Sequence, residues 1–393
     1  MRRAYTINQK KIIYNMSNTT ASILKNFLSK NKEIHFNNGD DSKAYKVSTG
    51  SRKLDLAMDG GFGPGIHRIG GASEGGKTSF CLEVVSNAFK TIDKCKCFYI
   101  KAEGRLSDKM QNRNGLKFVS TADEWDNHTV FVFKSNVFEP TLEIISELIK
   151  ENDGTTIIFI VDSVDGLNRK EDLNKSYSEG NQVAGTPLLL KIFCRRMSLP
   201  ITELRHMLFL ITQISADIKI GYAKETQKSI AGSGGNAAIH FPDWILQMEP
   251  TLQGDLITLS GETSESQIDK STNPILGHWA KVIIKKSSNE SSGYKVKYPV
   301  RRNVVGKSAV WKEYEISEFL QQWGFLSKKG GWFTFSENAI EKMKQVGIED
   351  IPEKINGPKN LQKLLDDRQD ITKYWDEYYI NILTNMKNKD DIL

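Results

Sequence analysis

The sequence predicts an α/β fold in which helices cover a mostly parallel central sheet. Short runs rich in β-branched and aromatic residues alternate with helical stretches over residues 47–248, and most of these runs are continuously apolar, as strands buried on both faces are. A chain of 393 residues is also long enough to bury a large core. The predicted strands are residues 97–102, 129–133, 156–161, 207–212 and 244–248, and the predicted helices are residues 79–90, 139–151 and 186–204.

The chain before this region predicts a short helix and a strand that have no core of their own. Residues 19–31 carry apolar side chains at helical spacing, and a strand-like stretch, residues 32–36, and a polar linker, residues 37–42, follow. Elements this small do not form a core by themselves, so we expect them to dock elsewhere, for example on a neighbouring subunit. The apolar residues of the helix are Ile23, Leu24, Phe27 and Leu28.

The chain after residue 248 predicts a different organisation. Residues 249–312 read as further strands joined by Gly- and Ser-rich turns, and a small mixed α+β segment begins at Glu313. The predicted domains are therefore an N-terminal tail, helix and strand, a central α/β core, and a small C-terminal subdomain with a tail. Their bounds are residues 1–46, 47–312 and 313–393.

Charge and cysteine content exclude several classes of protein. The apolar runs stop at five residues, far short of the roughly 18 that cross a bilayer, and residues 1–16 are basic without the apolar stretch of a secretory signal. Four irregularly spaced cysteines do not predict a disulfide framework, and the Cys95 and Cys97 pair has no second pair at metal-ligand spacing. We expect a soluble, cytoplasmic protein with reduced cysteines and no membrane partner, and Met16 leaves a second translation start open.

Positive charge is concentrated in one part of the chain. Subtracting 48 acidic from 54 basic residues gives a net charge of +6, which is ordinary when spread evenly. Residues 281–312, however, hold nine Lys or Arg against one acid, Glu290. The basic residues are Lys281, Lys285, Lys286, Lys295, Lys297, Arg301, Arg302, Lys307 and Lys312.

The most specific motif is G-A-S-E-G-G-K-T, from Gly71 to Thr78, between a strand-like I-H-R-I-G and a helix-forming stretch. It fits the phosphate-binding P-loop pattern, in which glycines let backbone N–H groups surround the phosphates, Lys77 reaches the β- and γ-phosphates and the Thr78 hydroxyl binds Mg²⁺. The motif predicts a site for ATP with Mg²⁺. Its predicted nucleotide-binding residues are Gly71, Ser73, Glu74, Gly75, Gly76, Lys77, Thr78 and Ser79.

Three polar residues at the ends of predicted core strands complete a hydrolytic site. Asp162 ends T-T-I-I-F-I-V-D, where a carboxylate can hold Mg²⁺ through water. Glu103 ends C-F-Y-I-K-A-E and Gln213 ends M-L-F-L-I-T-Q, where they could orient or deprotonate water and sense the γ-phosphate. Either residue alone is more often a polar strand terminus, but their joint placement beside a P-loop favours catalysis.

Two long loops are candidates for nucleic-acid binding. The stretch after Gln213 runs for 20 residues before G-G-N-A-A, and loops of that length in a compact domain are usually functional. It interleaves basic and aromatic side chains, which suit the phosphates and bases of a single strand. A second loop covers residues 170–183, although Lys-rich loops are often merely solvated. The candidate residues of the first loop are Lys219, Tyr222, Lys224 and Lys228.

Together, seven segments resemble those of RecA-type strand-exchange recombinases. The sequence of the long loop is more similar to phage recombinases of the UvsX type than to bacterial RecA. The resemblance spans about residues 20–340 and implies a RecA-like P-loop ATPase core. The segments appear in the family's order: residues 48–58, 71–78, 101–103, 161–164, 210–214, 234–237 and 330–335.

The resemblance implies specific roles. Lys77, Thr78 and Asp162 would bind ATP and Mg²⁺, Glu103 would be the base for water, and Gln213 the γ-phosphate switch. The loops at 170–183 and 214–233 would face DNA, with Asn236 of G-G-N-A in the DNA-binding set. Residues 19–36 would pack on the adjacent protomer of a helical filament. Other implied partners are single- and double-stranded DNA, a single-stranded-DNA-binding protein and a recombination mediator, in the cytoplasm of a bacterial or phage-infected cell.

Some positions depart from the family pattern. Lys285 matches one of two lysines that reach the neighbour's ATP, but the second falls on Ser287, for which Lys286 is a possible substitute. Met110 stands where an aromatic ring usually covers adenine, and Lys101 stands where an acid is usual. Residues after about 345, including Trp375, Tyr378 and Tyr379, have no clear counterpart.

Three functions are compatible with this constellation. The first is ATP-dependent filament formation on single-stranded DNA, followed by homologous pairing and strand exchange in recombination, repair and recombination-dependent replication. The second is a hexameric helicase, which usually has a larger N-terminal helical domain and lacks the G-G-N-A segment. The third is a non-catalytic ATP-binding regulator, against which the complete set of Lys77, Glu103 and Asp162 argues.

Overall fold

The computed structural model describes residues 20, 22–27, 29–30, 45–103, 106–151, 154–173, 185–214, 235 and 237–385. Contacts divide the chain into two units, Met1–Ala44 and Tyr45–Leu393. In the first unit the described residues between 20 and 30 are helical, as the spacing predicts, and Ile23, Leu24 and Phe27 are more than half exposed. Leu28 and the predicted strand at residues 32–36 lie outside the described residues.

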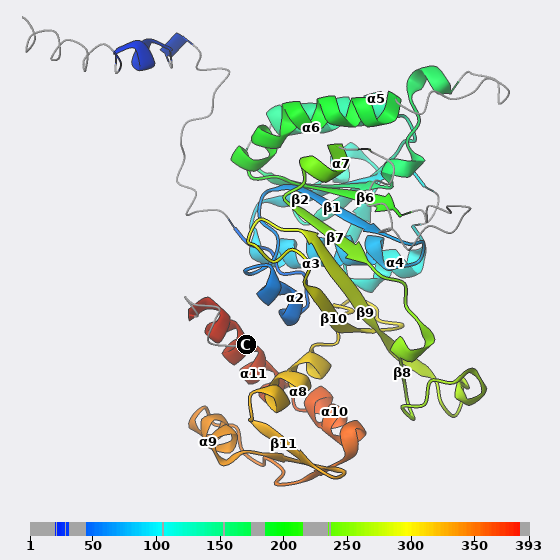
Figure 1. The fold of residues 1–393 in the computed structure, drawn as a ribbon, viewed down its shortest axis with the longest axis vertical. Coiled ribbons are helices and arrows are strands. Elements are labelled where there is room, and N and C mark those ends of the chain that lie inside the picture. The colour runs from blue at the N-terminus through cyan, green and yellow to red at the C-terminus, as the bar shows by residue number, and fades with distance from the viewer. Residues whose placement is uncertain are drawn as a thin grey trace, which may run out of the picture. The chain divides into compact units, whose positions relative to one another are not determined.

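A ten-stranded sheet is the centre of the second unit (Figure 1). Its strand order is β10-β9-β7-β1-β6-β5-β2-β4-β3, and β8 pairs with β9. The pairs from β7 to β3 are parallel, whereas β8, β9 and β10 join in antiparallel fashion, so the predicted mostly parallel sheet is confirmed. The strands are β1 (Gly65–Gly71), β2 (Cys95–Lys101), β3 (Lys117–Val119), β4 (Thr129–Lys134), β5 (Thr156–Asp162), β6 (Met207–Gln213), β7 (Trp244–Met248), β8 (Leu256–Thr258), β9 (Ile275–Lys286) and β10 (Lys295–Arg301).

Helices cover both faces of the parallel part, which explains why its strands are continuously apolar. Successive side chains of a strand point to opposite faces. In β2, Cys97 and Tyr99 join the core beneath α3, while Phe98 and Ile100 join the core beneath α5 and α6. The helices are α2 (Arg52–Ala57), α3 (Lys77–Thr91), α4 (Asp108–Arg113), α5 (Phe138–Lys150), α6 (Gly185–Glu203) and α7 (Ala237–His240).

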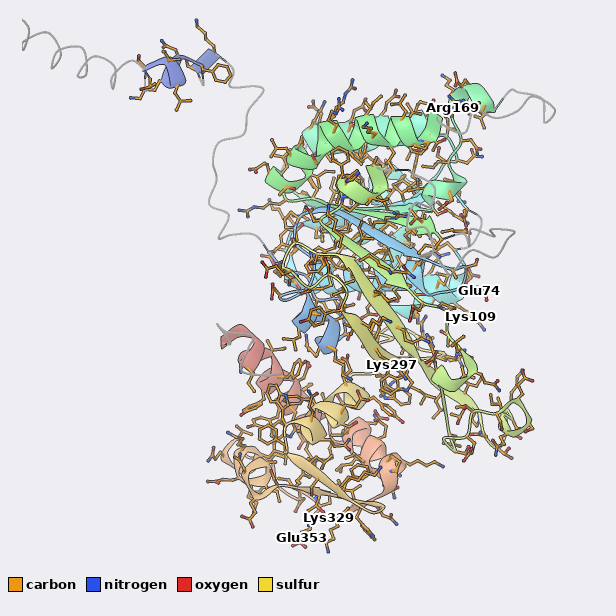
Figure 2. All side chains as sticks on the ribbon, in the orientation of Figure 1. Glu74, Lys109, Arg169, Lys297, Lys329 and Glu353 are labelled. Atoms are coloured by element: carbon orange, nitrogen blue, oxygen red, sulfur yellow. The ribbon has the colours of Figure 1, made fainter. Side chains whose placement is uncertain are left out.

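The C-terminal part builds its own core, including the residues for which the sequence offered no counterpart. Trp375 is fully buried and Tyr379 is nearly so, packed against Phe319 and other apolar residues of the same subdomain. Figure 2 shows Lys329 and Glu353 on its surface. Its elements are α8 (Lys312–Gln322), β11 (Leu326–Lys329), β12 (Trp332–Phe335), α9 (Glu337–Gln345), β13 (Ile355–Asn356), α10 (Gly357–Asp367) and α11 (Gln369–Asn385).

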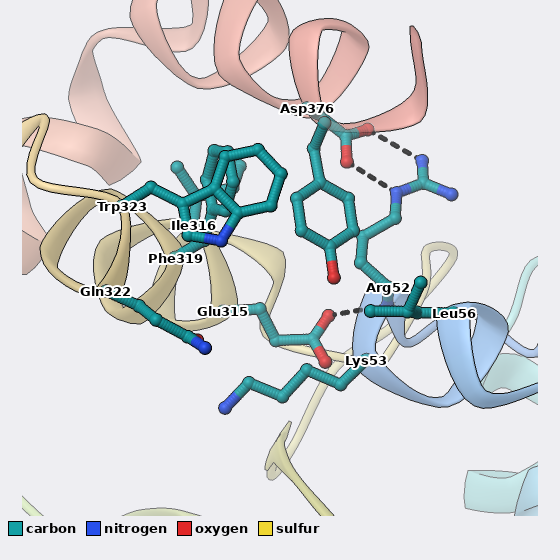
Figure 3. A pocket seen from close by; sticks show the side chains of 10 residues that line it. Arg52, Lys53, Leu56, Glu315, Ile316, Phe319, Gln322, Trp323 and Asp376 are labelled. Atoms are coloured by element: carbon teal, nitrogen blue, oxygen red, sulfur yellow. Dashed lines mark hydrogen bonds and ion pairs between the residues drawn. The ribbon is translucent and has the colours of Figure 1, made fainter. Parts of the chain in front are cut away.

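A group of charged residues joins this subdomain to α2, and we call it the junction cluster (Figure 3). Arg52 donates two hydrogen bonds to the Asp376 carboxylate, at 2.6 and 2.8 Å. Glu315 is buried and accepts hydrogen bonds from the Ser51 hydroxyl and the Arg52 backbone N–H, at the start of α2. Because the orphan N–H groups of a helix N-terminus need an acceptor, this contact fixes α8 against α2. The cluster comprises Ser51, Arg52, Lys53, Glu315, Glu318 and Asp376.

Two further findings bear on the class of protein. No helix in the described part of the chain is long and apolar enough to cross a membrane. All four cysteines are buried with free thiols, and burial raises the pKa of the Cys95 and Cys194 thiols to about 12. Buried thiols with raised pKa values are poor nucleophiles and poor metal ligands.

Candidate nucleotide site and nucleic-acid interface

The P-loop motif occupies the turn between β1 and α3, and two of its glycines are required by the backbone. Gly76 precedes the helix with a φ of 83°, in the left-handed region that side chains disfavour. A Cβ on Gly71 would lie 2.5 Å from the Met248 carbonyl oxygen of the neighbouring strand β7. Figure 2 shows Glu74, within the turn, and Lys109, on α4, at the same edge of this unit. The turn therefore presents the N-terminus of α3 at the carboxyl edge of the sheet.

Lys77 is held at this turn by backbone oxygens and not by an acid. Its ammonium donates to the Gly71 and Ala72 carbonyl oxygens, at 3.0 and 2.7 Å. Burial lowers the pKa of Lys77, and the nearby charge of Asp162 opposes that shift. Among the described residues, no carboxylate forms an ion pair with Lys77. Its positive charge therefore remains available to an anionic ligand.

Asp162 lies at the end of β5 and binds the first turn of α3. One of its oxygens, Oδ2, accepts hydrogen bonds from the Thr78 hydroxyl at 2.7 Å and the Tyr99 hydroxyl at 2.5 Å. Burial, together with the Asp162 charge, raises the pKa of Tyr99, so its hydroxyl stays a donor. A hydroxyl and a carboxylate oxygen in direct contact form the hard oxygen donor set that Mg²⁺ prefers. Thr78 and Asp162 thus fit a magnesium ion.

Glu103 and Gln213 lie in contact, although their strands do not neighbour each other. The Gln213 amide donates to Glu103 Oε1 at 3.3 Å, and the Ser163 hydroxyl donates to the same oxygen. The strand order β6-β5-β2 explains this, because the carboxyl ends of these parallel strands carry Gln213, Asp162 and, two residues beyond β2, Glu103. We call Lys77, Thr78, Asp162, Glu103 and Gln213 the sheet-edge cluster.

The sequence did not single out four residues that position this cluster. Tyr99 and Ser163 bind the two carboxylates, and Asp165 accepts the Gln213 backbone N–H at 2.7 Å. Arg68 donates to the Thr212 hydroxyl, next to Gln213. Only weak signals pointed to them: a tyrosine and an arginine inside otherwise apolar strands, and the polar residues of V-D-S-V-D.

The other residues predicted to contact the nucleotide lie outside the sheet-edge cluster. Met110 lies on α4 and packs partly against the core beneath α3, and Ser79 is near enough for the Arg113 guanidinium to donate to its hydroxyl at 3.4 Å. Lys286 donates to the His240 carbonyl oxygen at 2.7 Å, and Lys285 is half-buried beside it at the end of β9. Lys286 is thus already engaged within its own chain.

All five predicted DNA-binding residues lie outside the described part of the chain. These are Lys219, Tyr222, Lys224, Lys228 and Asn236, together with most of the two candidate loops. The described flanks are Gln213 and Ile214 on one side and α7 on the other. Of the second loop, Lys170–Asp172 forms a short 3-10 helix.

Part of the predicted positive charge is neutralised within the described fold. Lys281 forms an ion pair with Asp255 at 2.7 Å, and Arg301 pairs with Glu313 at 3.0 Å and with Asp366. Lys297 lies over the Trp279 ring at 4.9 Å. The nine basic residues therefore do not form one free patch.

Comparison with known proteins identifies the family. Residues 15–252 match the sequence model of the RecA N-terminal domain family. The chain is 24% identical to Protein RecA of Aquifex aeolicus over 313 residues, covering 76% of each chain. It is 25% identical to Protein RecA of Laribacter hongkongensis over 299 residues, covering 75% of this chain and 73% of the relative.

A solved structure of the RadB recombinase aligns with a TM-score of 0.43 at 16% identity, covering 67% of this chain and 98% of that chain. The family assignment does not depend on this weak likeness. The narrower resemblance to phage recombinases of the UvsX type stays a prediction. Because the family match extends over more than half of the sequence, this chain belongs to the RecA family.

Proposed function

We propose that this protein is an ATP-dependent DNA recombinase that forms filaments on single-stranded DNA and catalyses homologous pairing and strand exchange. It would serve recombination, repair and recombination-dependent replication in the cytoplasm of a bacterial or phage-infected cell. The observation that carries the proposal is the convergence of Lys77, Thr78, Asp162, Glu103 and Gln213 on one edge of the sheet. Residues from four separate parts of the sequence meet there, beside a P-loop.

The cluster supports ATP hydrolysis. Lys77 would exchange its two carbonyl contacts for phosphate oxygens, which offer it a stronger, charge-assisted bond. Mg²⁺, held by Thr78 and Asp162, would neutralise charge on the β- and γ-phosphates. Glu103 would accept a proton from the attacking water, because its carboxylate is oriented by two neutral donors and is not committed to a cation.

The same cluster supports a switch. Gln213 contacts Glu103 through its side chain and Asp165 through its backbone N–H, and it immediately precedes the long candidate DNA-binding loop. A change in the Gln213 side chain when a γ-phosphate is present would therefore bias DNA affinity. Strand exchange replaces one set of base pairs by an equivalent set, so the nucleotide need only alter affinity.

Self-association is supported by the N-terminal helix. Ile23, Leu24 and Phe27 are 64%, 57% and 56% exposed. An exposed apolar stripe of this kind on a short helix is expected to dock on another molecule. We propose that residues 19–36 bind the adjacent protomer, and that Lys285 reaches that protomer's ATP. A single-stranded-DNA-binding protein and a mediator are the further partners proposed.

Electron microscopy with single-stranded DNA and a non-hydrolysable ATP analogue tests the filament directly. We expect helical filaments that require both ligands. Closed rings would instead indicate a hexameric helicase, and isolated particles would contradict the proposed assembly. The matched control is Ile23→Asp with Phe27→Asp, which should abolish filaments and leave nucleotide binding intact.

Salt dependence tests the predicted DNA contacts. Replacing Lys219, Lys224 and Lys228 together by Ala should weaken binding to single-stranded DNA and reduce the slope of log affinity against log salt by roughly 0.7 for each phosphate that a lysine no longer neutralises. Fluorescence anisotropy at several salt concentrations measures both quantities. An unaltered slope would show that these lysines do not contact DNA.

A further inference from the structure

Arg68 is a fully buried arginine in the middle of the sheet. It is 1% exposed on β1, and arginines are almost never buried to this extent unless they are paired. Burial lowers the pKa of Arg68, and the charge of Asp165 opposes that shift. Burying the guanidinium therefore costs free energy, which its hydrogen bonds and the charge of Asp165 offset in part.

The contacts of Arg68 lie at the two ends of one segment. Its Nε donates to the Thr212 hydroxyl at 2.9 Å, and its Nη1 donates to the Ala238 carbonyl oxygen at 3.4 Å. Thr212 directly precedes Gln213, and Ala238 lies in the first turn of α7. The chain between them contains the candidate DNA-binding residues.

Arg68 is also linked electrostatically to the nucleotide side. Asp165, whose charge stabilises the guanidinium, accepts the Gln213 backbone N–H at 2.7 Å. Gln213 in turn donates to Glu103. The third guanidinium nitrogen, Nη2, has no hydrogen-bond partner among the described residues. Within the described part of the chain, this nitrogen of the buried group is therefore unsatisfied.

We propose that Arg68 is a positioning residue that transmits the state of Gln213 to α7, and thereby couples bound ATP to DNA affinity. This inference rests on the proposed function. When Gln213 turns toward a phosphate, Thr212 and Asp165 shift with it. Arg68 bonds to Thr212 and is attracted by Asp165, so it carries that shift to Ala238.

The test compares DNA affinity with and without an ATP analogue, alongside basal and DNA-stimulated ATPase activity. For Arg68→Met we expect the nucleotide-dependent gain in DNA affinity to fall by about tenfold or more, within the usual range of coupling between two sites. DNA affinity without nucleotide and the KM for ATP should change less than about twofold. DNA-stimulated kcat should fall by a larger factor than basal kcat.

Matched variants separate coupling from stability. Thr212→Val removes the Nε acceptor and should reproduce part of the loss, while Thr212→Ser keeps a hydroxyl and should restore coupling; this pair applies even where Arg68→Met fails to fold. His67→Leu changes the adjacent buried residue on β1 and controls for a weakened strand. The role proposed for Arg68 would be overturned if Arg68→Met kept the full nucleotide-dependent gain in DNA affinity, or if Thr212→Val and Thr212→Ser reduced that gain equally. Either result would leave the proposed function standing. If the unmodified protein binds DNA with the same affinity with and without the ATP analogue, the proposed function is overturned as well.

Discussion

Two groups of charged residues, the sheet-edge cluster and the junction cluster, satisfy their charges in opposite ways. At the junction, Arg52 and Asp376 form a bidentate ion pair, and Lys53 pairs with Glu318. At the sheet edge, the two carboxylates receive only neutral donors, from hydroxyls and an amide, and Lys77 binds only carbonyl oxygens.

The difference indicates what each cluster is for. In a pair of opposite charges with complete hydrogen bonds, the donors and acceptors are already occupied and bind a ligand poorly. Such a pair instead holds two structural elements together. Neutral donors orient a carboxylate while leaving its charge uncompensated, which suits a site that must accept a metal ion, a polyphosphate and a water molecule. Charge balance therefore separates the Arg52–Asp376 and Lys53–Glu318 pairs from the sheet-edge carboxylates. Glu315 also receives only neutral donors, but it is buried and its pKa is raised to about 7.

The strongest test of this contrast is Lys77→Ala. We expect ATP hydrolysis to fall by at least roughly 10³-fold, since one preorganised donor at a transferring phosphoryl group contributes on that order. The melting temperature should hardly change, because both backbone oxygens keep a second donor, the Ile214 N–H for Gly71 and the Gly75 N–H for Ala72, each at 3.2 Å. Turnover measured with and without DNA checks this, and unchanged turnover would remove the P-loop assignment.

Glu103→Gln sharpens the contrast within the sheet-edge cluster. Gln is isosteric and can still accept the Ser163 hydroxyl, but it cannot take a proton, so we expect hydrolysis to slow by about 10²-fold or more. Nucleotide binding and filament formation should persist. Normal turnover in a single-turnover assay would show that Glu103 is not the base.

Arg52→Ala addresses the junction cluster. Removing the guanidinium leaves the half-buried Asp376 without its bidentate partner, which we expect to cost about 2 kcal/mol of unfolding free energy. Basal ATPase activity should stay within about twofold of the unmodified protein. Lys53→Ala, which breaks a more exposed ion pair with Glu318, is the control and should cost at most about 1 kcal/mol. Equal losses in the two variants would contradict the assignment of Arg52.

The smallest expected effect, counted per pH unit, comes from the titration of Glu315. Burial raises the pKa of Glu315 from 4.5 to about 7, against the opposing bonds from Ser51 and Arg52 and the charge of Lys53. The unfolded chain thus releases this proton first, and stability contributed by protonated Glu315 is lost as pH rises from 4.5 to 7. Glu315→Gln cannot ionise and should remove a slope of up to about 1 kcal/mol per pH unit. Denaturant titrations across that window measure the slope, and Glu318→Gln controls for loss of a carboxylate from α8. Parallel slopes in Glu315→Gln and the unmodified protein would refute the assignment.

Much of this was predictable from local patterns. The strands and helices of the central core were placed to within a few residues, because long apolar runs and a P-loop turn depend on neighbouring residues only. The sequence also predicted that Asp162, Glu103 and Gln213 end their strands. The terminal helices α10 and α11 were not assigned. In α11 the buried Trp375 and Tyr379 lie among acids that obscure the apolar face.

The sequence by itself determined which chemical groups this protein possesses: the glycine turn, the lysine, the acids and the amide, each at or just after the end of a strand. Only the tertiary structure decided that β5 lies between β6 and β2, which brings Glu103 against Gln213, and that Arg68 lies between Thr212 and Ala238. The physical reason is that strand order and the burial of a charge depend on contacts between residues far apart in the chain, and no local pattern encodes these.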